Sequence, residues 1–526
     1  MSQFRLSRRG ALLGAGAGAL AGVAPWRAAR AAPADMTVVL ESEVVILDPH
    51  ATTVNITRTF GYHVFDTLFS MDSKGAIKPQ MVESHTMSED GLTWSFTLRP
   101  GLVFHDGTPV TAQDCVASLK RWGAKDNLGR MMTAATQTIE AKDPRTFIIA
   151  LREPFPMMLD VLGKPNAVVP FIMPERIIKA AGDGRITEII GSGPFRFVAD
   201  QWRPGNVMTL AKHDGYVPRS EPPDFLAGGK VVKVPRVLLQ VMPDDATGVS
   251  ALIAGEIDYM QFLPFDWLAK LGKTKDIELM ELSGIDMYQG NFRLNHATGP
   301  FADPAVRQVL WHLVDQNETL QAIGIPDRFR LKECRAFWMC DAPLSTNAGS
   351  EVAQFSIAKA KAALAKTKYN GEPVVMLNIA NSISHTAGIL FAAHMRAAGF
   401  TVDEQVMDWG TVLARRAKKD GWSMFPVYVS GLDISSPLTH FYVANSCADY
   451  VGWSCDARIP PLLKAFAYAP DLAARREIAT KIQVVAYELV PCVMWGQFSR
   501  PAGYRSRLKN LVQSSFPMFW NVEVAA

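Results

Sequence analysis

Sequence signatures of catalysis are absent from this chain of 526 residues. It has no G-x-S-x-G nucleophile elbow, no phosphate-binding P-loop, no H-E-x-x-H motif and no glycine-rich dinucleotide fingerprint. The short C-x-x-C and H-x-x-x-H clusters that hold zinc are missing too. Because catalytic triads often lack a local signature, an enzyme is disfavoured rather than excluded. We expect a protein that is not an enzyme and that holds no cofactor and no metal.

Long runs of one charge sign are also lacking. The chain has 54 basic and 51 acidic residues, a net charge of +3. Residues 1–31 hold five arginines and no acid, so the net charge falls to −2 without them. A nucleic-acid surface is therefore not indicated. The hydrophobic share of 48% is that of a globular protein, and the length predicts two or three domains.

The N-terminus has the order of features of an export signal. Arg5, Arg8 and Arg9 precede a Gly- and Ala-rich apolar run over 11–24, and 29–31 read Ala-Arg-Ala. The run is short for a membrane span, although a membrane anchor is the alternative. We predict that residues 1–31 are a signal peptide of the twin-arginine type, removed on export to the periplasm.

Cysteine is scarce. The six cysteines are Cys115, Cys334, Cys340, Cys447, Cys455 and Cys492. None precedes Cys115, which argues against a lipid-anchored lipoprotein, and the pattern around Cys115 predicts a helix with that thiol in its core. An oxidising compartment permits disulfides, and Cys334 with Cys340 and Cys447 with Cys455 are near enough to close small loops. Sequence alone leaves the pairing open.

Periodicity predicts mixed α/β domains. Residues 92–98 alternate as a half-buried strand, and 102–104 are expected to start the returning strand. Thr111 is expected to cap a helix that runs to about Trp122. Asp303 and Pro304 are expected to open another, whose apolar stripe continues to residue 314.

A later stretch has the pattern of an α/β unit. Residues 374–379 predict a strand, and 385–398 predict a helix that Gly399 ends. Residues 400–406 predict the next strand.

Several blocks in register carry a family resemblance. They are Leu47-Asp48-Pro49-His50, Val64–Phe69, Gly75–Trp122, Gly191–Tyr216, Ala254–Asp258 and Pro300–Gln308. The sequence is similar to the peptide/nickel-type extracytoplasmic solute-binding proteins of ABC importers over nearly its whole length after the signal. Within these blocks, His105-Asp106-Gly107 is better explained as a turn than as a catalytic pair.

The resemblance implies an α/β fold of the bilobal periplasmic-binding-protein type. Residues 32–54, 190–286 and 496–526 would form a discontinuous lobe I, with 55–189 as an inserted subdomain on it and 287–495 as lobe II. It implies a monomer that captures a small solute, most of all short peptides, by lobe closure and delivers it to an ABC permease in the inner membrane.

The resemblance also nominates ligand-binding residues. Asp433, four residues before Pro437 and after a strand over 424–429, matches the aspartate that binds a peptide's amino terminus, the alternative being a solvated loop aspartate. Trp409 matches a tryptophan near the cleft, with core packing as the alternative, and Cys447 with Cys455 matches a family disulfide. Further candidates next to the expected hinge crossings are Thr53 and Tyr62 after the first, Tyr288 and Asn291 after the second, and Trp495 after the last.

Two departures put a strict dipeptide clamp in doubt. Residues 377–382 lack the arginine that would grip the peptide carboxylate, and Ser430 stands where the family has a tryptophan. The ligand alternatives are therefore a longer peptide, an opine, an oligosaccharide, haem or a metal chelate. A secreted hydrolase is the distant alternative.

Overall fold

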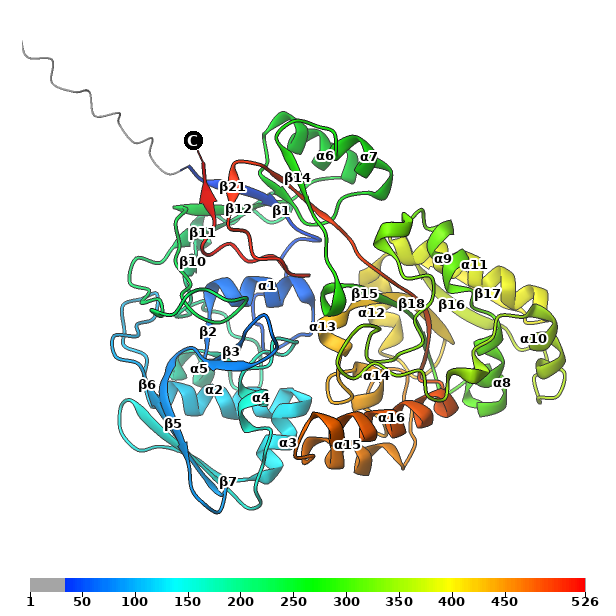
Figure 1. Ribbon diagram of the computed structural model, residues 1–526, viewed down its shortest axis with the longest axis horizontal. Coiled ribbons are helices and arrows are strands. Elements are labelled where there is room, and N and C mark those ends of the chain that lie inside the picture. The colour runs from blue at the N-terminus through cyan, green and yellow to red at the C-terminus, as the bar shows by residue number, and fades with distance from the viewer. Residues whose placement is uncertain (1–33, 526) are drawn as a thin grey trace, which may run out of the picture. The chain divides into compact units, whose positions relative to one another are not determined.

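The computed structural model describes residues 34–525 (Figure 1). The predicted signal peptide over residues 1–31 lies outside this range. Within it, no helix has both the length and the apolar character needed to cross a bilayer.

A first sheet of seven strands gathers segments from both ends of the chain. Its order is β10 (Phe195–Phe197), β11 (Val207–Lys212), β12 (Arg236–Gln240), β1 (Met36–Val39), β13 (Tyr259–Met260), β20 (Ala502–Arg505) and β14 (Ile277–Met280). β1 runs parallel to β12 and β13, whereas β20 is antiparallel to both of its neighbours. The end of the chain therefore returns to the sheet that its beginning started.

A second sheet has five strands, all of which come after β14 and before β20 in the sequence. Its order is β17 (Val402–Met407), β16 (Val374–Ile379), β18 (Met424–Ser430), β15 (Tyr288–Leu294) and β19 (Cys492–Phe498). β16 is parallel to β17 and β18, and β15 is antiparallel to β18 and β19. The predicted strand–helix–strand unit is confirmed, because β16 leads into α11 (Ile383–Ala398), Gly399 ends that helix in the left-handed conformation, and β17 follows.

A third, antiparallel sheet has the order β5 (Val82–Met87), β6 (Thr93–Leu98), β8 (Thr146–Leu151) and β7 (Thr136–Ala141). β6 alternates buried and less buried residues as predicted. The predicted return strand at 102–104 is wrong, since β6 pairs with β5 and β8. Val103 forms only an isolated bridge to Pro109, because Thr108 O accepts from Phe104 N and folds this segment into the turn expected at 105–107.

Short two-stranded pairs and helices complete the fold. The strand pairs are β2 (Asp66–Thr67) with β9 (Phe171–Ile172), β3 (Phe69–Met71) with β4 (Ile77–Pro79) and β21 (Leu508–Lys509) with β22 (Glu523–Val524). The other helices are α1 (Asn55–Val64), α2 (Ala112–Lys125), α3 (Asn127–Ala135), α4 (Met158–Leu162), α5 (Glu175–Ala181), α6 (Asp245–Ala254), α7 (Leu268–Leu271), α8 (Pro304–Val309), α9 (Gln316–Ala322), α10 (Ile357–Leu364), α12 (Trp409–Arg416), α13 (Gly431–Ile434), α14 (Phe441–Ala444), α15 (Ile459–Ala467) and α16 (Leu472–Leu489).

Two predicted helix starts are confirmed by their caps. Thr111 forms a reciprocal capping box with Asp114 at α2, and the Asp303 carboxylate accepts from the backbone of α8. The stripe predicted to continue to residue 314 is interrupted, because α8 ends at Val309 and a tighter turn follows. Tertiary contacts set this end, since the Trp311 indole donates to the carbonyl of Tyr487 at 3.0 Å.

The cysteines divide into two pairs and two single thiols. Cys334 is bonded to Cys340 and Cys447 to Cys455, while Cys115 and Cys492 are free and buried. Cys115 lies in the core of α2, as its pattern predicted.

The block Leu47-Asp48-Pro49-His50 fastens the segment after β1 to α2. Asp48 accepts from both terminal nitrogens of Arg121 at 3.0 and 2.6 Å, and from the backbone amides of His50 and Ile186, each at 3.0 Å. Both side chains of the ion pair are almost fully buried. The block that carries the resemblance is thus a structural tie between distant segments.

The chain passes between the first and second sheets at 281–287, from β14 to β15, and at 499–501, from β19 to β20. We call the first sheet with α1 and the other segments packed on it the first lobe, and the second sheet with its helices the second lobe. The predicted domain bounds stay a prediction.

Candidate ligand-binding site

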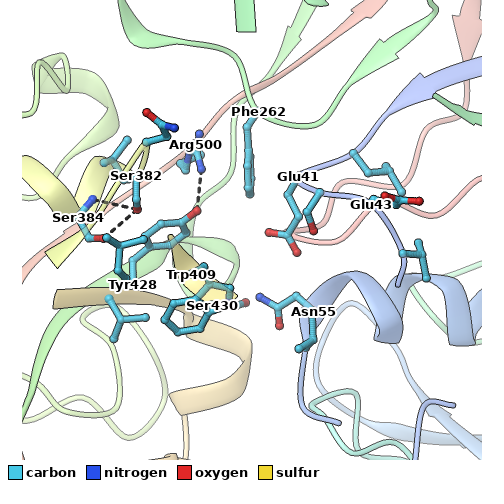
Figure 2. A pocket seen from close by; sticks show the side chains of 18 of the residues that line it. Glu41, Glu43, Asn55, Phe262, Ser382, Ser384, Trp409, Tyr428, Ser430 and Arg500 are labelled. Carbon is cyan, nitrogen blue, oxygen red and sulfur yellow. Dashed lines mark hydrogen bonds between the residues drawn. The ribbon is translucent and has the colours of Figure 1, made fainter. Parts of the chain in front are cut away.

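A cavity of about 970 Å³ is lined by residues of both lobes. The first lobe contributes residues 39–44, 53–55 and 239–245. The second contributes 379–384 and parts of α12 and β18, and Arg500 comes from the crossing at 499–501. The carboxyl end of the parallel strand β16 and the start of α11 meet here, the position where α/β sheets usually bind ligands. Figure 2 shows side chains from both lobes facing one another across it.

Asp433 lines the cavity but is already paired. One carboxylate oxygen accepts from Arg58 of α1 at 2.6 Å, and both side chains are 2% exposed. Arg58 also donates to Asn55 at 3.2 Å and lies over the ring of Phe516 at 4.6 Å. Asp433 belongs to the short helix α13 rather than to a loop. The ion pair therefore joins the first lobe to the second and neutralises the carboxylate nominated for a ligand amine.

Glu41 projects a carboxylate into the cavity that has no hydrogen-bond or ion-pair partner in the described part of the chain. Its backbone amide donates to Gln261 at 2.9 Å, whereas its carboxylate forms no hydrogen bond or ion pair within residues 34–525. Burial raises the pKa of Glu41, and the charges of Arg500 and Arg58 lower it only in part. Figure 2 shows this carboxylate directed across the cavity toward Tyr428. A cationic group of a ligand would relieve its desolvation.

Arg500 is a cation without a carboxylate partner in the described part of the chain. One terminal nitrogen donates to the Tyr428 hydroxyl at 2.9 Å, and the guanidinium lies 3.8 Å from the ring centre of Phe262 (Figure 2). These contacts fix the plane of the guanidinium but leave its charge uncompensated. Such a group suits a carboxylate, which accepts two parallel hydrogen bonds from arginine.

A second cation lines the wall of the second lobe. Arg416 of α12 lies 5.1 Å from the ring centre of Trp409 and 5.4 Å from that of Phe425. Trp409 also lines the cavity and is 37% exposed, so its ring is available to a ligand. The role of Trp409 as a ligand contact stays a prediction.

The start of α11 adds polar groups to the same wall. Ser382 caps the helix, and its hydroxyl lies 2.8 Å from that of Ser384 (Figure 2). Amides at the first turn of a helix favour negative charge. Residues 377–382 lack the expected arginine, but the amides at the start of α11 favour an anion at the same wall.

The remaining nominated residues divide into one at the cavity and four away from it. Thr53 lines the cavity. Tyr62 stacks on Phe516 at 5.4 Å, and the Tyr288 hydroxyl donates to the Ser515 carbonyl at 2.8 Å. Neither is among the lining residues.

Asn291 and Trp495 are core residues as well. The Asn291 amide donates to the Gln289 carbonyl, and the Trp495 indole donates to the Val427 carbonyl at 3.1 Å. A Cβ on Gly290 would lie 2.0 Å from the Trp495 ring, so this ring fills the space above that glycine. Trp495 also precedes the crossing at 499–501 instead of following it. These four side chains pack the scaffold behind the cavity.

Sequence reasoning missed Arg58, Glu41, Arg416 and Arg500. None belongs to a family block or a recognisable motif, and Arg58 meets Asp433 across 375 residues of sequence. The single available signal was that Glu41 lies two residues after the end of β1, since sites in α/β sheets often lie just beyond the ends of strands. Within residues 34–525 no cluster of three or more His, Cys, Asp or Glu side chains could hold a metal ion.

Comparison with known proteins gives this site its context. Residues 76–451 match the family described as "Bacterial extracellular solute-binding proteins, family 5 Middle". The chain belongs to this family. It is 35% identical over 512 residues, covering 95% of both chains, to a "Probable peptide ABC transporter periplasmic-binding protein y4tO" from Sinorhizobium fredii. This member is therefore the solute-binding component of an ABC transporter, in a family that acts outside the cytoplasm.

Two solved structures share the bilobal fold. The periplasmic binding protein DppA from Helicobacter pylori, in complex with peptide STSA, has a TM-score of 0.80 at 20% identity, covering 94% of this chain and 98% of that one. The binding protein AgaA from A. tumefaciens R10, in complex with agropinic acid, has a TM-score of 0.78 at 22% identity, covering 94% and 99%. At this identity the likeness concerns the fold.

Proposed function

We propose that this solute-binding protein captures short peptides in the cavity between its lobes and presents them to an inner-membrane permease. The observation that carries the proposal is a pair of opposite charges, Glu41 and Arg500, that line one cavity between the lobes and form no ion pair within residues 34–525. A free peptide brings an ammonium and a carboxylate, and burying either without a partner is costly. A ligand that bridges the lobes shifts the open–closed equilibrium toward the closed form.

The cellular setting belongs to the same proposal. Residues 1–31 direct export by the twin-arginine route and are removed, and the mature chain acts in the periplasm as a monomer without catalysis and without nucleic acid. The relative named as a periplasmic peptide-binding protein supports this setting, as does the ordinary net charge of the mature chain.

An opine or another amino-acid conjugate is the second candidate ligand. The opposite charges and the exposed Trp409 ring suit any solute that carries an ammonium, a carboxylate and an apolar part. One protein of similar fold was solved in complex with agropinic acid.

Native mass spectrometry of the mature protein, purified without unfolding, tests the proposed function. We expect bound masses that resolve into a mixture of short peptides after release. A single non-peptide species would keep the transport role and overturn the peptide assignment. Release of a hydrolysis product from added peptides would contradict the absence of catalysis.

Replacing Arg500 with methionine is expected to weaken binding of carboxylate-bearing peptides about 10- to 150-fold, because a hydrogen bond to a charged group contributes about 1.5–3 kcal/mol. Methionine removes the guanidinium that lies over Phe262 and leaves an unbranched apolar side chain in its place. Calorimetry with free and C-amidated peptides separates loss of carboxylate binding from general damage. The amidated peptide has no carboxylate, so its affinity should change little. Arg176→Met, at an exposed ion pair on α5, is the matched control. Equal losses for both peptide forms would contradict a role in carboxylate binding.

A further inference from the structure

The charge that the resemblance assigns to a ligand's amino terminus is cancelled within the protein. Asp433 and Arg58 form a buried pair at 2.6 Å, so an ammonium placed beside Asp433 would also meet the Arg58 guanidinium. An ion pair presents little net field to a third charge, and desolvating an ammonium without a net attraction is unfavourable. Asp433 is therefore unsuited to receive a ligand amine in this chain.

The acidic groups available to a ligand lie on the opposite wall. Glu41, Glu43 and Asp244 of the first lobe line the cavity, together with Asp245. Glu43 already accepts from the Gly205 amide at 2.8 Å, and Asp244 caps α6 by accepting from Thr247. Asp245 is exposed to solvent. Within residues 34–525, Glu41 is the half-buried carboxylate of this wall that has no hydrogen-bond or ion-pair partner.

The second lobe has the opposite character. Arg416 and the first turn of α11 both favour an anion there. Arg500 lies between the walls, at the crossing from β19 to β20. The cavity is thus acidic on the first lobe and basic on the second once Asp433 and Arg58 are paired.

We propose that Glu41 receives the ammonium of the ligand, so that the ligand lies with its amino end against the first lobe and its carboxylate toward Arg500 and the second lobe. This orientation is the reverse of one anchored on Asp433. It rests on the proposed function, since it concerns the polarity of a peptide in that cavity. The raised pKa of Glu41 agrees with it, because a cation from the ligand would stabilise the charged form.

The test compares free with N-acetylated alanine peptides of three to five residues. Wild type, Glu41→Gln and Asp433→Asn are stripped of ligand by unfolding with intact disulfides and refolded, and each dissociation constant is measured by calorimetry. We expect wild type to prefer the free amine by about 10- to 150-fold. Glu41→Gln should abolish this preference, whereas Asp433→Asn should keep it.

The ratio of the two affinities separates charge recognition from structural damage. Asp433→Asn leaves Arg58 without its counterion, so both peptide forms should weaken together while their ratio stays. Glu140→Gln, at an exposed glutamate of β7, controls for the loss of a negative charge. The inference would be overturned if Asp433→Asn lost the preference for the free amine, or if Glu41→Gln kept it. Either result would leave the proposed function of peptide binding standing. Binding of no peptide form by wild type would overturn the proposed function, and the inference would fall with it.

Discussion

Replacing Arg58 with methionine is expected to reduce solute affinity by about 30- to 5,000-fold, which corresponds to about 2–5 kcal/mol. Arg58 belongs to α1 of the first lobe and Asp433 follows β18 of the second, so we expect their ion pair to form only while the lobes are together. Removing the guanidinium leaves the Asp433 carboxylate buried and uncompensated in the closed form. The open form exposes that carboxylate to water and loses nothing comparable, so the equilibrium shifts toward it.

The measurement uses an N-acetylated alanine tetrapeptide, because this probe has no ammonium for the released Asp433 to bind. Its affinity is determined by calorimetry, and closure by energy transfer between dyes on the exposed faces of α6 and α10. The double variant Arg58→Met with Asp433→Leu should recover most of the closure, since an apolar pair can replace a buried ion pair at little cost.

An exposed ion pair provides the control for the buried pair of Arg58 and Asp433. Glu153, after β8, lies 3.2 Å from Lys464 of α15, and their side chains are 48% and 63% exposed. Glu153→Gln should change the closure free energy by no more than about 1 kcal/mol. Equal effects of Arg58→Met and Glu153→Gln would contradict a specific role for the buried pair.

The Arg58–Asp433 pair shows which parts of the site could be predicted from the sequence and which could not. Local signals located strands and caps, because β6 alternates, Thr111 pairs with Asp114 and Gly399 ends α11 within a few residues of sequence. Family spacing brought Asp433 and Trp409 to the cavity. The partner of Asp433 lies 375 residues away, and no periodicity encodes which charge meets which across such a distance. The position of the site could therefore be predicted from the sequence, but the pairing of its charges could not.

Two of the nominated residues lie outside the cavity for a shared physical reason. Tyr288 and Asn291 belong to β15, which has neighbours on both sides in the second sheet and is buried along its full length. A strand next to a crossing was expected to present side chains to the cleft. In a strand covered on both faces, adjacency to the crossing does not decide exposure. Thr53 precedes α1 on the segment that borders the cavity, and it does line it.

The family block around Asp48 leads to a stability prediction of similar size. Arg121→Met should lower the free energy of unfolding by about 3–5 kcal/mol, because it leaves a buried carboxylate that had two bonds from the guanidinium. Urea unfolding followed by tryptophan fluorescence measures it. Arg145→Met breaks an exposed pair with Glu83, whose side chains are 46% and 51% exposed, and should cost no more than about 1 kcal/mol.

The pH dependence identifies the carboxylate as the origin of that loss. Burial alone raises the pKa of Asp48, but the hydrogen bonds and charge of Arg121 outweigh it, and the folded pKa lies below its ordinary value. The wild-type pair therefore contributes stability above the ordinary pKa of aspartate and loses it as the pH falls through the lowered one. In Arg121→Met the hydrogen bonds and charge of the guanidinium no longer offset the burial, so the pKa of Asp48 is expected to rise and protonation to relieve the folded state. The difference between variant and wild type should consequently be largest at pH 7 and shrink toward pH 4, and a difference that is constant across this range would assign the loss to packing instead of charge.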